Sequence, residues 1–246
     1  MKLRVVPPEG TLEAMLEGNS LARFGDGECK IMDGSREFVY FQDGTDELAH
    51  ELRSLIGARK STTLVGVFDV RCEYRPMRTI IRDWHSKLAF HAHKDRTYYS
   101  TLVTRLDLFP RLGTKDWFDK FATLWRGKRV TLIANGIRSV TPELLLNEGA
   151  AQVDFIECSG RNAYAEIDHL ERRALSFDNH LILMCAGMTA TCLAERLAVK
   201  GRQALDVGHV GRFWRRYGEI PVWRVLHNES ARALFNEDGS VAGNPE

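Results

Sequence analysis

The sequence predicts an α/β protein with a Rossmann-like, doubly wound sheet that is mainly parallel. Short apolar runs alternate with amphipathic helical stretches from residue 129 to residue 207, and this strand–helix order is typical of parallel sheets. A separate run, residues 63–68, is apolar at nearly every position, as in a strand that is covered on both faces. In such sheets ligands bind beyond the carboxyl ends of the strands, so the chemistry is expected in the turns that follow them.

The first part of the chain is the less regular one. Thr11 is expected to cap a helix that ends at Gly18, and Thr45 to cap a second helix with its apolar residues on one face. Residues 98–105 are polar and aromatic, and we interpret them either as the wall of a substrate cleft or as a covered loop. The other predicted elements are helix 11–18, strand 20–26, an extended segment at 38–42, helix 46–56, strand 63–68 and a long helix from 76 towards 91.

The second part of the chain carries the regular alternation. Thr114 is expected to cap a helix whose aromatic stripe packs in the core. The predicted strands are 129–134, 152–157, 181–185 and 204–207, and the predicted helices between them are 142–147, 163–175 and 190–199. With no evident linker or repeat, we predict one domain over 1–220 and a partly flexible C-terminal extension over 221–246, in which 223–226 add an edge strand.

Composition excludes several classes of protein. The chain has 246 residues, enough for one large α/β domain, and a formal net charge of +1, which argues against a dedicated nucleic-acid-binding protein. The basic, aromatic stretch 212–217 is therefore interpreted as a cover for a site, a stacking surface or a partner contact. The start lacks the apolar core of a signal peptide and no apolar run is long enough for a membrane span, so we predict a cytoplasmic protein. The five cysteines are scattered without a Cys-x-x-Cys pair, which favours reduced thiols.

The stretch 20–28 contains the first candidate site. Asp26 and Glu28 are separated by one glycine, so in an extended backbone both carboxylates leave the same face and can converge on one divalent cation. Gly25 and Gly27 leave room for a ligand against the main chain and permit positive φ. Arg23 can bind a phosphate through both ends of its guanidinium. The alternative is an Asp-Gly turn with a solvated Glu28 and a surface ion pair at Arg23, because motifs this short also occur by accident.

Two further candidates follow later strands. Gly187 ends a strand and Thr189 lies in the first turn of the next helix, where free N–H groups and the helix dipole favour an anion. An ordinary threonine cap is an equally good interpretation of this turn. Asp206 and His209 follow the last strand in the same way, and His209 is interpreted as a metal ligand, a phosphate ligand, an acid or base, or a structural hydrogen-bonding residue.

Four separated motifs resemble the GT-D-type glycosyltransferases and occur in the same order. They are Arg-Phe-Gly-Asp-Gly-Glu at 23–28, Asn-Ala-Tyr at 162–164, Gly-Met-Thr-Ala-Thr at 187–191 and Asp-Val-Gly-His at 206–209. The resemblance runs from about residue 20 to residue 209 and implies a Rossmann-like fold, a nucleotide-sugar donor such as UDP-glucose, and a divalent metal at Asp26 and Glu28. The chain departs from the family pattern in two places. It has Met188 where the family commonly has proline, and 210–214 lacks the acidic residues that the family tends to carry there, which suggests a different donor or acceptor.

The resulting hypothesis is a metal-dependent glycosyltransferase that moves a sugar from a UDP-sugar to a hydroxyl of a glycan or glycoprotein. Asp26 and Glu28 hold Mn²⁺ or Mg²⁺ and, with His209, form the catalytic set. The residues expected at the donor are Arg23, Gly25, Gly27, Asn162, Gly187, Thr189 and Asp206. Glu28, His209 and Asp69 remain alternative bases for the acceptor hydroxyl. Rival hypotheses are another nucleotide-dependent transferase or hydrolase on the same fold, and a non-catalytic module that binds nucleotide sugars or glycans. The oligomeric state is left open.

Overall fold

The computed structural model describes residues 3–36, 38–106, 108–109, 112, 114–135 and 140–217. The extension predicted over 221–246, with its edge strand at 223–226, lies outside these residues. Within the described part, no helix is both long enough and apolar enough to cross a membrane. The cytoplasmic location stays a prediction.

An eight-stranded sheet forms the centre of the molecule, and every strand pair in it is parallel. The strand order is β1-β6-β5-β2-β10-β9-β7-β8. The strands are β1 (Arg4–Val6), β2 (Ser20–Arg23), β5 (Thr63–Val67), β6 (Thr97–Ser100), β7 (Arg129–Ala134), β8 (Gln152–Glu157), β9 (Leu181–Cys185) and β10 (Gln203–Asp206). The predicted α/β class with a mainly parallel sheet is confirmed.

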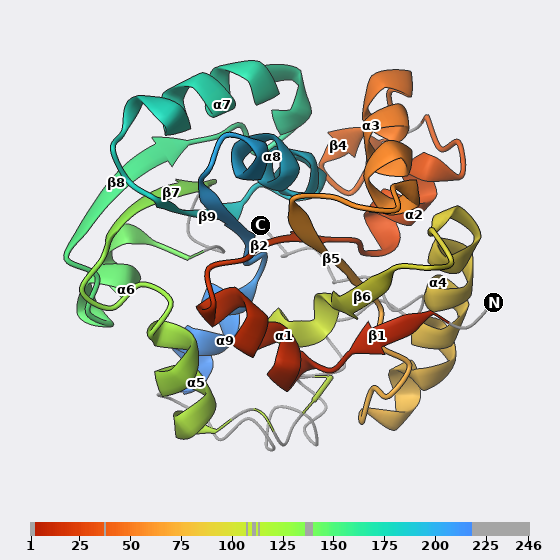
Figure 1. The fold of residues 1–246 in the computed structure, drawn as a ribbon, viewed down its shortest axis with the longest axis horizontal. Coiled ribbons are helices and arrows are strands. Elements are labelled where there is room, and N and C mark those ends of the chain that lie inside the picture. Colours follow the sequence, from red (N-terminus) through yellow and green to blue (C-terminus); the bar gives the residue numbers. More distant parts are fainter. Residues whose placement is uncertain are drawn as a thin grey trace, which may run out of the picture.

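Helices cover both faces of this sheet. In Figure 1, α3, α7 and α8 lie above the sheet in the view, and α1, α5 and α9 lie below it. The α-helices are α1 (Pro8–Leu16), α2 (Asp26–Met32), α3 (Asp46–Gly57), α4 (Arg78–His91), α5 (Lys115–Ala122), α6 (Pro142–Asn147), α7 (Ile167–Ser176), α8 (Met188–Val199) and α9 (Val210–Tyr217). Short 3₁₀ helices precede α4 (Arg75–Met77), follow β6 (Thr101–Thr104) and precede α7 (Ala163–Glu166). The threonine side chains at 45 and 114 cap α3 and α5 as the sequence predicts.

The strand order reverses at the centre of the sheet, between β2 and β10. β2 and β10 pair with each other, although they are far apart in sequence. From β2 the chain goes on to β5 and β6 on one side, whereas β7, β8 and β9, which precede β10 in the sequence, lie on the other side. A ligand site is expected at the carboxyl ends of two strands that meet in this way.

Three local expectations were wrong. Residues 97–100 form β6 rather than a loop, because Tyr98 and Ser100 point into the core while their neighbours are half-buried. Thr11 does not cap α1, which begins at Pro8; its hydroxyl donates to the carbonyl of Pro7 and accepts from Ser100 N–H. Residues after Gly25 form the helix α2 and not an extended segment. Tertiary partners decide all three.

A small hairpin lies outside the main sheet. Strands β3 (Phe38–Val39) and β4 (Gln42–Asp43) pair in antiparallel fashion around a turn at Tyr40 and Phe41. Asn162 fixes this hairpin: its side chain accepts from Asp43 N–H at 2.7 Å and donates to the Asp43 carboxylate at 2.6 Å, and its own N–H donates to the carbonyl of Phe41. The hairpin is therefore fixed to the turn that follows β8.

The described part of α9 closes the lower face. Trp214 is 8% exposed and packs against Phe118 and Trp125 with ring centroids 4.9 and 5.2 Å apart. This aromatic side chain of the basic stretch is therefore core. The five cysteines are buried and carry free thiols.

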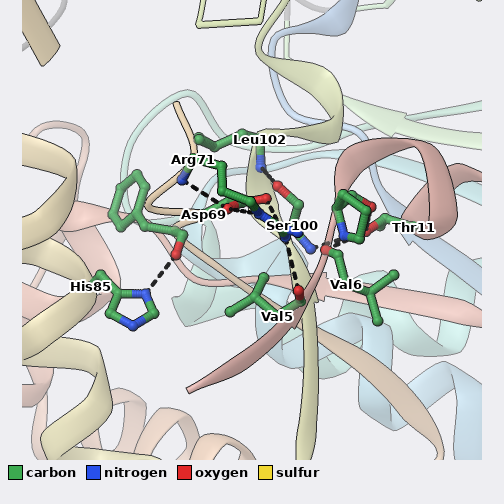
Figure 2. Close-up of polar contacts among 10 residues, drawn as sticks. Val5, Val6, Thr11, Asp69, Arg71, His85, Ser100 and Leu102 are labelled. Atoms are coloured by element: carbon green, nitrogen blue, oxygen red, sulfur yellow. Dashed lines mark hydrogen bonds and ion pairs between the residues drawn. The ribbon is translucent and has the colours of Figure 1, made fainter. Parts of the chain in front are cut away.

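The edge of the sheet at β1 is tied down by a polar cluster (Figure 2). Asp69, which follows β5 and is 1% exposed, accepts from the backbone N–H, Nε and Nη2 of Arg71. Arg71 also donates to the carbonyl of Val5 in β1 at 2.8 Å. Both carboxylate oxygens of Asp69 are thus engaged by its own turn, which makes it a poor base for the acceptor hydroxyl.

Candidate active site

An ion pair joins the two central strands at their carboxyl ends. Arg23, the last residue of β2, donates from Nη2 to the Asp206 carboxylate at 3.0 Å and from Nε to the Asp206 carbonyl at 2.9 Å. Its Nη1 donates to the carbonyl of Thr101 and to the hydroxyl of Thr104. Four of its five N–H groups therefore have acceptors within the described chain. The contact of Arg23 with a phosphate therefore stays a prediction, which only the remaining N–H or a rearranged side chain could fulfil.

Asp206 is almost fully buried at this junction. Its side chain is 5% exposed, and it also accepts from Gly208 N–H at 3.0 Å. Burial raises the pKa of Asp206, and the guanidinium of Arg23 acts in the opposite direction. Asp206 therefore holds Arg23 and the turn after β10 in place, and a direct contact with the donor is not required for that role.

The two carboxylates of the Asp-x-Glu motif lie in different environments. Because α2 begins at Asp26, the two residues occupy the first and third positions of a helix, and their side chains do not leave one face as they would in an extended segment. Asp26 is half-buried and accepts a hydrogen bond from the hydroxyl of Tyr40. Glu28 is 7% exposed and turns back to accept from Gly25 N–H at 2.8 Å. The argument that an extended backbone directs both carboxylates to one cation is therefore wrong. The functional roles of Asp26 and Glu28 stay predictions.

Glu28 has a second partner, the hydroxyl of Thr191. Thr191, in α8, lies 3.0 Å from Oε1 of Glu28 and 2.9 Å from the carbonyl of Arg23. A hydroxyl has one proton, so it cannot donate to both acceptors at once. A neutral Glu28 resolves the conflict by donating to Thr191, which then donates to Arg23. In agreement, burial raises the pKa of Glu28 to about 7, against the opposing effect of the backbone N–H groups.

The start of α8 lies directly beside the start of α2. Gly187 has φ of +56°, and Met188, the first residue of α8, reaches the Gly27 Cα so closely that a Cβ there would lie 2.5 Å from its Cε. Neither Gly25 nor Gly27 has a positive φ, so backbone conformation does not require glycine at either position, and a Cβ at Gly27 would have to displace the end of the Met188 side chain. Two helix N-termini thus meet at the centre of the sheet, where their dipoles favour an anion.

Thr189 is the polar side chain of this helix start. It is fully buried, and its hydroxyl has no hydrogen-bond partner among the residues that the structure describes. A buried hydroxyl without a partner is uncommon because it loses its hydration without compensation. This supports Thr189 as part of a polar ligand site more than as an ordinary cap, since it makes no capping bond to α8.

The hairpin brings two aromatic rings to the two helix starts. The ring of Tyr40 lies next to Gly27, and the ring of Phe41 lies so close to Gly187 that a Cβ at Gly187 would collide with it. Asn162, which the sequence places at the nucleotide, anchors the hairpin through its side-chain amide. The contact of Asn162 with a nucleotide stays a prediction. In this structure its side-chain amide is bonded to Asp43, so Asn162 would act on a nucleotide through the hairpin.

His209 occupies the turn between β10 and α9. Its side chain is exposed and its carbonyl accepts from Arg212 N–H at 3.0 Å. The preceding Gly208 has φ of +47°, and a Cβ there would collide with the guanidinium of Arg23. His209 therefore follows directly on the turn that Arg23 and Asp206 hold.

Two residues of this site were not assigned from the sequence. Thr191 lies within the 187–191 motif and carried the signal, yet only the packing of α8 on α2 shows that it holds Glu28. Tyr40 gave no signal beyond its place in an extended apolar segment, because its contact with Asp26 joins residues of two different elements.

Of the two carboxylates, Asp26 fits a divalent cation better than Glu28. Asp26 is half-buried at the start of α2, whereas both oxygens of Glu28 already have partners. Across the described ranges, no group of three or more His, Cys, Asp and Glu side chains is arranged to hold a metal ion. Mg²⁺ commonly keeps several waters and binds one or two carboxylates together with substrate phosphates, so one carboxylate is sufficient.

Comparisons with known proteins agree with this arrangement. The family model described as "Glycosyltransferase GT-D fold" matches residues 21–227. A probable glycosyl transferase, Gly, of Streptococcus gordonii is 28% identical over an alignment of 254 positions, which covers 96% of this chain and 36% of that protein. Glycosyltransferase GlyD of Streptococcus pneumoniae serotype 4 is 27% identical over 93% of this chain and 30% of its own length. The chain spans about a third of the length of these curated relatives.

Solved structures show the same fold. A selenomethionine-substituted structure of the domain of unknown function 1792 has a TM-score of 0.77 and 27% identity, and covers 88% of this chain and 82% of its own. A glycosyltransferase of that domain type from Streptococcus sanguinis has a TM-score of 0.75 and 25% identity over 88% of this chain and 85% of its own. The family model covers most of the length of the chain, and the parallel sheet has its switch point at the centre. The chain therefore belongs to the GT-D-fold glycosyltransferases.

Proposed function

We propose that this protein transfers a sugar from a nucleoside diphosphate donor, such as UDP-glucose, to a hydroxyl of a glycan or glycoprotein. The observation that carries this proposal is the meeting of the α2 and α8 N-termini at the carboxyl ends of β2 and β10. Helix starts favour anions, so two neighbouring helix starts suit the two phosphates of a diphosphate.

The reaction forms a bond from the acceptor oxygen to the anomeric carbon and breaks the bond from that carbon to the diphosphate oxygen. The electron pair leaves on the diphosphate, and the proton of the acceptor hydroxyl passes to a base. Negative charge on the diphosphate therefore increases towards the transition state, and groups that stabilise it there accelerate the reaction. The N-termini of α2 and α8 are fixed in advance by packing and need no reorganisation during the step.

The side chains divide into groups that face the ligand and groups that position others. We assign Asp26, Thr189 and the backbone at Gly187 to the donor. Arg23, Asp206 and Glu28 hold the ends of β2, β10 and α8 together and act through them. A divalent cation, held by Asp26 together with the diphosphate oxygens, would neutralise part of the leaving charge when it is bound. A direct bond from Glu28 to this cation requires Glu28 to leave the N–H of Gly25.

His209 is the base that the geometry favours for the acceptor hydroxyl. It is exposed beside the switch point, and a neutral imidazole can accept a proton near neutral pH. Asp69 is saturated by Arg71, and Glu28 is buried with both oxygens in use.

Calorimetric titration with UDP and with GDP, in Mn²⁺ and then in EDTA, tests the donor assignment. We expect UDP to bind in Mn²⁺, binding to weaken in EDTA, and the metal-dependent part to vanish in Asp26→Ala. Asp33→Ala is the matched control, because it removes a carboxylate from the C-terminal end of the same helix. Failure of both nucleotides to bind the folded protein would overturn the proposal.

A transfer assay then separates the enzyme from its rivals. With UDP-glucose and a panel of oligosaccharides, a glycosyltransferase yields an extended glycan. Release of free glucose without any extended product would identify a hydrolase. UDP binding with no turnover on any acceptor would identify a non-catalytic binding module.

A further inference from the structure

We propose that Tyr40 and Trp84, with Lys30 between them, form the subsite that binds a sugar ring of the acceptor, immediately beside Asp26. This inference rests on the proposed function, because it assigns the acceptor side of the same site. The residues come from three elements, namely the β3–β4 hairpin, α4 and α2. We call them, together with Lys87, the aromatic platform.

The contacts of Lys30 show that the platform is continuous with Asp26. Lys30 lies one helical turn after Asp26 on α2, so both side chains lie on the same face of that helix. Its Nζ donates to the hydroxyl of Tyr40 at 3.2 Å, and that hydroxyl in turn donates to the Asp26 carboxylate. The same Nζ lies 4.7 Å from the ring centroid of Tyr40 and 5.8 Å from that of Trp84. Two aromatic rings and one ammonium thus adjoin the carboxylate assigned to the donor.

The backbone of Tyr40 has an unfavourable conformation. Tyr40 has φ of +60° in the tight turn of the hairpin, a conformation that favours glycine and is strained for other residues. The turn is held in place because Asn162 and the bond from Tyr164 N–H to Gln42 fix the β4 strand that follows it. Strain of this kind, retained in a well-fixed segment, is concentrated at functional sites.

The chemistry of the platform matches a pyranose ring. Tyr40 is 39% exposed and Trp84 is half-buried, so each ring is fixed by packing while part of it is accessible. A sugar ring has an apolar C–H face that packs on an aromatic ring and hydroxyls that need polar partners at its edge. An ammonium has three N–H donors, and Lys30 uses one on Tyr40, so it can also donate to a sugar hydroxyl. Lys87, 4.4 Å from the Trp84 centroid, borders the same ring.

The position of the platform assigns it to the acceptor rather than to the donor. The diphosphate is placed between α2 and α8, whereas Trp84 lies on α4, which packs against α2 and α3. In Figure 1, α4 and α8 lie at opposite sides of α2. Asp26 is the shared boundary, so a sugar on the platform would approach the donor from the side away from α8.

Saturation-transfer NMR with cellobiose, lactose and chitobiose tests the platform without relying on turnover. We expect at least one of these β-linked disaccharides to receive saturation from the wild-type protein and to lose it in Trp84→Ala. Phe90→Ala is the matched control: Phe90 is an 87% exposed aromatic residue on the same helix and should leave the signal unchanged. Trp84→Phe keeps a ring and the packing of α4, so it should retain part of the signal even if Trp84→Ala is unstable.

Kinetics on the active protein add a second readout. With UDP-glucose as donor, Trp84→Ala should raise the KM for the acceptor by about tenfold or more, the loss expected when a sugar–aromatic contact is removed. The Kd for UDP should stay within about twofold of wild type. A disaccharide signal that is absent from the wild type, or that persists in both Trp84 variants, would overturn this inference. Absence of UDP binding would instead overturn the proposed function, so the two failures are distinguishable.

Discussion

The ends of β2 and β5 are neighbours in the sheet and carry similar residues, yet they are built in opposite ways. After β5, Asp69 is neutralised by Arg71 two residues later, and the turn is closed on itself (Figure 2). After β2, Arg23 instead reaches across to Asp206 of β10. Asp26 is left at the start of α2 with a tyrosine hydroxyl as its partner. A local ion pair makes a structural turn, whereas a distant one leaves a carboxylate available for chemistry.

Removing the arginine of each pair should separate the two ends most clearly. Arg23→Met leaves the buried Asp206 without its cation, and we expect unfolding free energy to fall by about 3–5 kcal/mol. Arg71→Met should cost about 1–2 kcal/mol, because the Arg71 side chain is 51% exposed and Asp69 keeps the bond from the Arg71 backbone N–H. Urea denaturation of both variants measures the difference. Equal losses would show that the two pairs are alike.

The pH dependence of stability tests the buried carboxylate of α2. The pKa of Glu28 is raised to about 7, so the folded protein keeps this proton where the unfolded chain has lost it. The contribution of neutral Glu28 to the free energy of unfolding is therefore fully present below about pH 4.5 and is lost as the pH rises through about 7. The total loss of stability is about 3 kcal/mol.

Glu28→Gln mimics the neutral form and should remove this part of the slope. Urea titrations of both proteins between pH 4.5 and 8, in metal-free buffer, give the comparison. A slope identical in wild type and variant would contradict the neutral Glu28.

Activity should distinguish the carboxylates that follow the two strands. Asp26→Asn keeps the size of the side chain and its bond from Tyr40 but removes the charge, and we expect transfer to fall by about 100-fold or more. Asp69→Asn should lower stability while the folded fraction keeps a rate within about twofold of wild type. Initial rates normalised to folded protein check both. A loss of transfer in Asp69→Asn as large as that in Asp26→Asn would contradict the contrast.

The turn after β10 offers a smaller effect with a matched control. Gly208→Ala combines a positive φ with a collision against the Arg23 guanidinium, whereas Gly18 has a positive φ with no atom near its missing Cβ. We expect Gly18→Ala to cost about 1 kcal/mol and Gly208→Ala about 2 kcal/mol in thermal or urea unfolding. If both cost the same, Arg23 moves aside freely and its position is not set by this turn.

Part of the fold could be predicted because its signals are local. Strands 129–134, 152–157 and 181–185 and helix 142–147 agree with the structure at both ends, since apolar runs and flanking proline or glycine fix them within the segment itself. The first part was harder. β1 and β6 are short, and Tyr98 and Ser100 are polar enough to conceal a buried strand. The burial of Tyr98 and Ser100 is decided by α1 and β5, which pack against β6.

The sequence by itself determined the α/β class, the strand-end turns and the motifs that identify the family. These depend on periodicity and on residue order, both of which are properties of a continuous segment. The tertiary structure decided what each motif residue does. Asp26 and Glu28 are two positions apart in the sequence, but in α2 the Asp26 side chain is half-buried and the Glu28 side chain is buried. There Glu28 contacts the hydroxyl of Thr191 from α8. Arg23 and Asp206 are 183 positions apart, and only the pairing of β2 with β10 brings their charges together. Burial and contacts between distant segments set the charge and direction of a side chain, and neither can be read from neighbours in the sequence.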